Sequence, residues 1–114
     1  MEFMLVLYED PDLVTTEQQR TEAVQRVGEY AMGLLGDGVL TGGSPLHPIT
    51  EAKKIRSRDG VRRVLDGPFA ESKEVIAGYF LIEAPDVAAA VAIAERCPNA
   101  EFGSVEVREI VPMG

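Results

Sequence analysis

The chain has 114 residues, of which 46% are hydrophobic and 26% charged, a composition typical of one globular domain. Nineteen acidic residues against eleven basic ones give a net charge of −8. A negative charge of this size disfavours general binding to nucleic acids. No stretch has the roughly 20 consecutive apolar residues of a transmembrane helix, and the single cysteine, Cys97, excludes an internal disulfide and predicts a cytoplasmic location.

The first part of the chain is predicted to form a strand, a helix and a second strand. Residues 2–8 are apolar at nearly every position, which is typical of a strand buried on both faces and not of a signal peptide. Thr16 and Gln19 form a capping box, so a helix is expected over residues 16–37, where glycines end it. Residues 39–41 begin a second extended segment, which the following Gly-Gly pair interrupts. The expected buried stripe of the helix consists of Ala23, Val24, Val27, Ala31, Leu34 and Leu35.

The middle of the chain is predicted to be a β-hairpin exposed to water. Polar and apolar residues roughly alternate over 54–58 and 61–65, and Asp59-Gly60 between them supplies the positive φ angles of a type I′ turn. This region is strongly basic. It contains six of the eleven basic residues, namely Lys53, Lys54, Arg56, Arg58, Arg62 and Arg63. Because the hairpin has no aromatic residue for stacking on bases, direct nucleic-acid binding is not expected.

The last part of the chain repeats the order strand, helix, strand. Residues 75–82 are apolar on both sides and predict a central strand, while Asp86 is the cap of a helix that Pro98 ends. Residues 104–108 alternate and predict a half-exposed final strand. The expected apolar helix face consists of Val87, Ala90, Val91, Ala94 and Cys97. The whole chain is therefore predicted to be one α+β domain, two βαβ halves joined by a hairpin.

The number of helices predicts a partner chain. Two helices can cover only one face of a four-stranded sheet, yet the strands at 3–8 and 75–82 are apolar on both sides. Large apolar side chains left in water forfeit roughly 1.5–3 kcal/mol each. The hairpin is a poor cover because it is charged. We therefore expect a symmetric homodimer in which two copies pack sheet against sheet.

The loop 66–74 has the sequence Asp-Gly-Pro-Phe-Ala-Glu-Ser-Lys-Glu. This loop resembles the signature loop of the YCII-related family, specifically of its DGPF subfamily. Residues 56–60, 77–82, 96–98 and 103–108 look like the same subfamily. The resemblance covers almost the whole chain and implies a ferredoxin-like monomer, with an antiparallel sheet, that forms a dimeric α+β barrel. The chain departs from the subfamily at Glu109, where proline is common, so the geometry of this end is not implied.

The resemblance implies no established activity and leaves two hypotheses open. Wider YCII-related proteins have been proposed as enzymes that use a His/Asp pair, and DGPF proteins are often linked with extracytoplasmic-function sigma factors. One hypothesis is therefore a small-molecule binding protein or enzyme with a polar acid/base pocket in the dimeric barrel. The other is a regulatory protein–protein module that presents the basic hairpin to a sigma-factor-type partner.

The loop 66–74 contains the candidate catalytic residues. Asp66 and Glu71 are carboxylates close in sequence to Lys73, and a desolvated carboxylate can act as a general base near neutral pH while a lysine holds an anionic substrate. The alternative is structural: Asp66 caps the turn and the other charges are solvated.

The candidate ligand-binding residues are His47, Glu106 and Arg108. His47 is the sole histidine and follows a Gly- and Pro-rich stretch that suits the rim of a pocket, although the resemblance assigns it no catalytic role. Glu106 and Arg108 lie two residues apart on a strand, so both side chains point to the same face. The ligand they fit is small and polar. A metal site needs several convergent ligands, and neither a metal nor a cofactor is expected.

Overall fold

The computed structural model describes residues 1–67 and 73–113. Within them no helix has the length and hydropathy needed to span a membrane. The elements in chain order are β1 (Glu2–Glu9), α1 (Glu17–Gly36), β2 (Leu40–Pro45), the 3-10 helix η1 (Ile49–Glu51), β3 (Lys53–Arg58), β4 (Val61–Asp66), β5 (Val75–Glu83), α2 (Val87–Glu95), α3 (Asn99–Phe102) and β6 (Gly103–Glu109).

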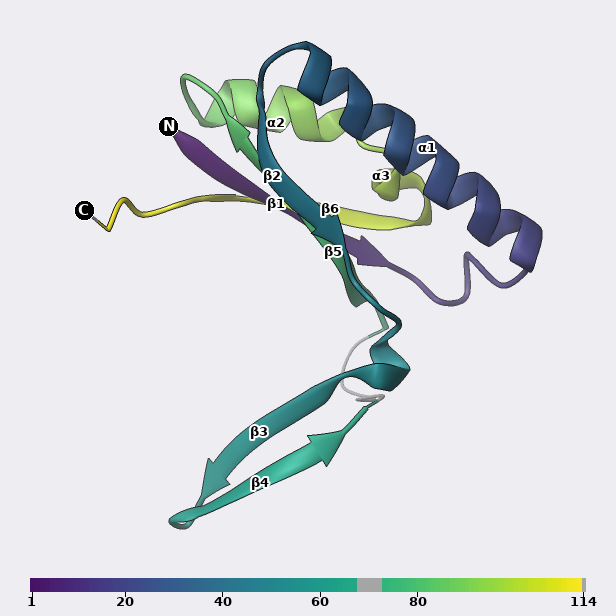
Figure 1. Ribbon diagram of the computed structural model, residues 1–114, viewed down its shortest axis with the longest axis vertical. Helices are drawn as coiled ribbons and strands as arrows, with labels where there is room; N and C mark the ends of the chain where they lie inside the picture. The colour runs from purple at the N-terminus through teal and green to yellow at the C-terminus, as the bar shows by residue number, and fades with distance from the viewer. Residues whose placement is uncertain (68–72, 114) are drawn as a thin grey trace.

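Strands β1, β2, β5 and β6 form one antiparallel sheet, in which their spatial order is β2-β5-β1-β6. Strands β1 and β5 are central, as their apolar sequences predict, and each βαβ half contributes one central and one edge strand. Figure 1 shows α1 and α2 together on one side of this sheet. The predicted ferredoxin-like α+β fold is therefore confirmed, and the other face of the sheet carries no helix from the described residues.

Side chains of the central strands alternate between the two faces. In β1, Phe3, Leu5 and Leu7 are buried against the helices, whereas Met4 and Val6 are only half-buried on the opposite face. Strand β5 continues both sets, because directly opposed residues of antiparallel strands point to the same side. The half-buried set defines what we call the open face, with Met4 opposite Leu81 and Val6 opposite Tyr79.

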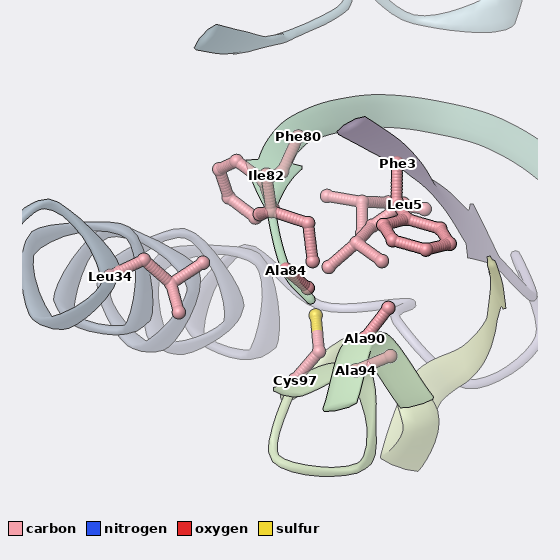
Figure 2. Close-up of a cluster of buried hydrophobic side chains, with 10 residues drawn as sticks. Phe3, Leu5, Leu34, Phe80, Ile82, Ala84, Ala90, Ala94 and Cys97 are labelled. Atoms are coloured by element: carbon pink, nitrogen blue, oxygen red, sulfur yellow. The ribbon is translucent and has the colours of Figure 1, made fainter. Parts of the chain in front are cut away.

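The hydrophobic core lies between the sheet and the two long helices. Phe3, Leu5 and Ile82 are fully buried. Figure 2 shows how these strand side chains meet Leu34 from α1 and Ala90 from α2. Small residues on α2 let that helix approach the sheet closely, so the core is filled mainly by side chains of the strands. Burial raises the pKa of the Cys97 thiol in this core, as expected of a small buried residue and not of a nucleophile.

The capping box of α1 is present as predicted. The Thr16 hydroxyl accepts a hydrogen bond from the Gln19 backbone N–H, and the Gln19 side chain accepts one from the Thr16 N–H. The predicted stripe is too wide, however, because the side chains of Val24 and Leu35 are 63% and 57% exposed. They flank the narrower face on which Ala23 and Leu34 are buried, and Val27, Tyr30 and Ala31 are partly buried. The same correction applies on α2 to Val87, which is 52% exposed, and to Val91.

Strand β2 continues through the two glycines that were expected to interrupt it. Gly43 has a φ of 148°, and a Cβ atom there would lie 2.7 Å from the Tyr79 carbonyl oxygen. Gly78 allows the same close approach from the other strand, since its Cβ would lie 2.9 Å from the Ser44 carbonyl oxygen. Glycine therefore serves here to bring β2 onto β5 and not to break the strand.

The predicted hairpin is present and separate from the main sheet. Strands β3 and β4 pair only with each other, and Asp59 and Gly60 have φ angles of 53° and 75°, as a type I′ turn requires. Figure 1 shows the hairpin extending away from the domain, on the side that the helices leave uncovered. The radius of gyration is 15.8 Å, against about 13 Å for a compact domain of this length.

Tyr30 joins the two helices and makes stability depend on alkaline pH. Its hydroxyl donates a hydrogen bond to the Ile93 carbonyl oxygen at 2.6 Å, and burial raises the pKa of Tyr30 to about 12. A phenol whose pKa is higher in the folded state holds its proton longer when folded. Its contribution is therefore complete below about pH 10, the ordinary value, and is lost as the pH rises towards 12.

We expect Tyr30→Phe to lower the free energy of unfolding by about 1–2 kcal/mol at pH 7, because the Ile93 carbonyl loses its donor. Between pH 9 and 11 the variant should lose less stability than the wild type. Urea unfolding at several pH values measures both effects. Cys97 also titrates at alkaline pH, so the comparison is made in a Cys97→Ala background. Equal pH slopes for the two proteins would show that Tyr30 does not contribute.

Candidate functional site

A cavity of about 570 Å³ lies between residues 20–31 of α1 and the sheet. This volume is within the range of small-molecule sites, roughly 300–1,000 Å³. The wall is largely apolar. Its apolar side chains include Leu7, Val14, Val27, Ile49, Val75, Ile76, Phe80 and Phe102. The sequence predicts a polar pocket, whereas the wall of this cavity is largely apolar, with a few polar groups at its edges.

An ion pair forms the polar part of the cavity wall. Arg20 donates two hydrogen bonds to the two carboxylate oxygens of Glu9, one of them 2.8 Å long. The Glu9 side chain is only 9% exposed, while that of Arg20 is 52% exposed. A buried carboxylate is costly unless it is paired, so Arg20 compensates Glu9 and closes this end of the cavity with a nearly neutral group.

The segment after β2 forms the opposite edge of the cavity. The Leu46 N–H donates to the Ala77 carbonyl oxygen at 2.9 Å, which holds the segment against β5. His47 follows directly and lines the cavity at its rim, with its side chain 89% exposed. Its Nδ1 lies 3.5 Å from a carboxylate oxygen of Glu51. Of the predicted ligand-binding residues described by the structure, His47 is therefore the one that borders the cavity.

Sequence reasoning did not find most of the cavity residues. Glu9 and Arg20 lie eleven positions apart, on a strand end and a helix, and no local pattern links them. Gly28 was also overlooked, although a glycine inside a long helix is a recognisable signal because it costs about 1 kcal/mol relative to alanine. Gly28 lines the cavity, and no atom lies within 4 Å of where its Cβ would be.

The predicted residues Glu106 and Arg108 lie on the open face, away from the cavity. Arg108 is opposite Met4 and Glu106 is opposite Val6 in the register of β6 with β1. The Tyr8 hydroxyl donates to Glu106 at 3.2 Å. Partial burial and the neighbouring Glu106 carboxylate raise the pKa of Tyr8. These three side chains form a polar group on the open face, beside the apolar residues Met4 and Val6.

The structure does not bring the described loop candidates together. Asp66 ends β4 and pairs with Lys53 across the hairpin, with both side chains largely exposed. Lys73 lies 3.4 Å from the buried carboxylate of Asp10. Glu71 lies outside the described residues. As candidate catalytic residues, Asp66, Glu71 and Lys73 stay predictions.

A model of the YCII-related domain matches residues 1–114, the full length of the chain. An uncharacterized protein of Rhizobium meliloti (strain 1021) is 40% identical over 67 residues, which are 57% of this chain and 54% of that protein. The aligned part thus spans about half the length of this curated relative.

A solved structure has a similar fold. It is 5-chloro-2-hydroxyhydroquinone dehydrochlorinase (TftG) from Burkholderia phenoliruptrix AC1100, in complex with 2,5-dihydroxybenzoquinone. The TM-score is 0.57 at 16% sequence identity, and the match covers 100% of this chain and 96% of TftG. At this identity the likeness concerns the fold alone.

Proposed function

Since this chain belongs to the YCII-related family, we propose that it binds a small, largely apolar molecule in the cavity between α1 and the sheet. It does so either as a binding protein or as an enzyme. The observation that carries the proposal is the cavity itself: about 570 Å³, apolar walls, and a few polar groups at two edges. Sites with this composition bury an apolar ligand and orient it through a small number of polar contacts.

The lining favours a planar ring compound with polar substituents. Phe80 and Phe102 offer aromatic surface, and the Glu9–Arg20 pair and His47 offer hydrogen-bonding groups at the two edges. The similar structure of TftG contains 2,5-dihydroxybenzoquinone, a compound of this kind. At 16% identity this is a reason to test such compounds and does not transfer the activity.

The proposed acid–base role stays with Asp66, Glu71 and Lys73, as predicted from the sequence. Of the proposed ligand-binding residues, His47 lies at the rim of the cavity, while Glu106 and Arg108 would contact a ligand only in a second, polar site on the open face. For Asp66, Glu71 and Lys73, the discriminating variant is Asp66→Asn. If the folded variant binds and reacts as the wild type does, Asp66 has no part in the site.

We also propose the homodimer through the open face. Met4, Val6, Tyr79 and Leu81 are half-buried there, and a second sheet would remove them from water with a gain of roughly 1.5–3 kcal/mol for each fully buried side chain. If two copies pack with their open faces together, each copy covers the apolar side chains of the other in a symmetric dimer. A reducing cytoplasm fits the free, buried Cys97. Neither the family match nor the fold match supports a sigma-factor partner.

The direct test is calorimetric titration of the purified protein with 2,5-dihydroxybenzoquinone and with catechol. We expect saturable binding of one molecule per chain, and chemical-shift changes that cluster at Val27, Ile49 and Ala77. Binding that shifts only open-face residues outside the cavity lining, such as Met4 and Leu81, would contradict the cavity. If neither compound binds saturably, the proposal of an aromatic ligand loses its support.

We expect His47→Gln to weaken binding of the same compounds about three- to tenfold, because it removes one hydrogen-bonding group at the rim and leaves the apolar walls intact. The matched control is Glu51→Gln, which removes the charged neighbour of His47 from outside the cavity lining. Both residues are exposed, so the thermal midpoints should stay close to that of the wild type. Equal affinities for all three proteins would remove His47 from the site.

A further inference from the structure

We propose that the β3–β4 hairpin is an arm that grips a second copy of this chain. The inference extends the proposed homodimer from the open face to a second contact surface. It starts from the position of the hairpin, which forms its own two-stranded sheet and extends on the same side of the main sheet as the open face (Figure 1). A second copy seated on the open face would therefore lie next to the arm.

The arm exposes apolar side chains that its own domain does not cover. Ile55 and Val64 are directly opposite each other in the register, so they share one face of the hairpin. Their side chains are 67% and 66% exposed. An isolated two-stranded hairpin is marginally stable in water, and a rigid arm of this kind needs a surface to pack on. An exposed cross-strand apolar pair is a contact surface of the right shape for a partner.

The charge of the arm points to the identity of that partner. Residues 53–66 carry six basic and two acidic side chains, which leaves five basic and seventeen acidic side chains for the rest of the chain. A basic segment is attracted to an acidic surface, and the body of a second copy supplies one. The arm and the body are therefore complementary, as a symmetric interface requires.

The first test compares the double variant Ile55→Thr/Val64→Thr with the wild type by sedimentation velocity. Threonine keeps a high strand propensity, so the hairpin is preserved while its apolar face is lost. We expect the dissociation constant of the dimer to rise at least tenfold. The matched control is Met32→Gln, because Met32 has the same 67% exposure but lies on α1. Its dimer should be unchanged. An unchanged dissociation constant in the double variant would contradict the proposed contact between the arm and the second copy.

The second test locates the arm by carbodiimide cross-linking of mixed ¹⁴N- and ¹⁵N-labelled protein. The chain has three lysines, and two of them, Lys53 and Lys54, are in the arm. We expect heavy–light peptides that join these lysines to acidic residues outside the hairpin. The Lys53–Asp66 ion pair is an internal control and should give only same-chain peptides. Arm cross-links confined to one chain would also overturn the proposal.

These outcomes are separate from the ligand proposal. A wild-type protein that stays monomeric at micromolar concentration would overturn both the open-face dimer and the arm, whereas the cavity is formed by one chain. Calorimetry with 2,5-dihydroxybenzoquinone on the Ile55→Thr/Val64→Thr variant measures the cavity independently, and binding there should persist.

Discussion

The Gly28→Phe variant should fold normally and lose about seventyfold in affinity for the aromatic ligands of the cavity. No atom lies within 4 Å of the Cβ position at Gly28, so a larger side chain enters the open space of the cavity without a backbone clash. If the ring displaces about 100 Å² of buried ligand surface, the loss at about 25 cal/mol per Å² is about 2.5 kcal/mol. Replacing a helical glycine also favours the helix by several tenths of a kcal/mol.

The matched control for this variant is Gly33→Phe. Gly33 lies on the same helix, also has no atom within 4 Å of its Cβ position, and is not part of the cavity lining. The two variants therefore share the change in helix propensity and differ in the cavity. Calorimetric titration gives the affinities and thermal unfolding gives the stabilities. If Gly28→Phe and Gly33→Phe bind equally well, the ligand does not occupy this cavity.

Phe3→Ala is expected to lower the free energy of unfolding by about 3–5 kcal/mol. Phe3 is fully buried between the sheet and the helices, and truncation leaves a cavity in a core whose other wall is made of small α2 residues (Figure 2). This is a large part of the 5–15 kcal/mol that stabilises a typical domain. Urea unfolding measures the loss. Should Phe3→Ala not fold, Phe3→Leu gives a smaller, measurable loss at the same position.

The neighbouring residue Met4 provides the comparison, because it lies on the open face. We expect Met4→Ala to cost the isolated chain less than about 1.5 kcal/mol and to weaken the dimer at least tenfold. Sedimentation velocity measures the second effect. A large loss of chain stability from Met4→Ala, with an unchanged dimer, would mean that the open face is covered by the chain's own residues.

Local patterns predicted the elements of this protein well. The capping box at Thr16, the cap at Asp86 and the Asp59-Gly60 turn each act through atoms a few residues apart, so a short stretch of sequence determines them. The apolar character of β1 and β5 likewise placed both strands at the centre of the sheet. The resemblance to the YCII-related family is confirmed over the whole chain.

The sequence misjudged elements that depend on neighbours far along the chain. Gly42 and Gly43 read locally as an interruption, but the close approach of β5 makes them part of β2. Val24 and Leu35 fit the helical period, yet only tertiary packing decides how wide a stripe the sheet covers. The short helices at 49–51 and 99–102 were not predicted either.

The sequence alone therefore determined the α+β class, the central strands, the caps and the exposed basic hairpin, because these follow from local periodicity and turn chemistry. Only the tertiary structure decided where a ligand can bind. The cavity is lined by a strand end at Glu9, a helix at Arg20 and a loop at His47, and the separation of these residues in sequence hides the fact that they line one cavity. It also showed that Asp66 and Lys73, which are close in sequence, pair with different residues: Asp66 ends β4 and pairs with Lys53, whereas Lys73 precedes β5 and lies next to Asp10.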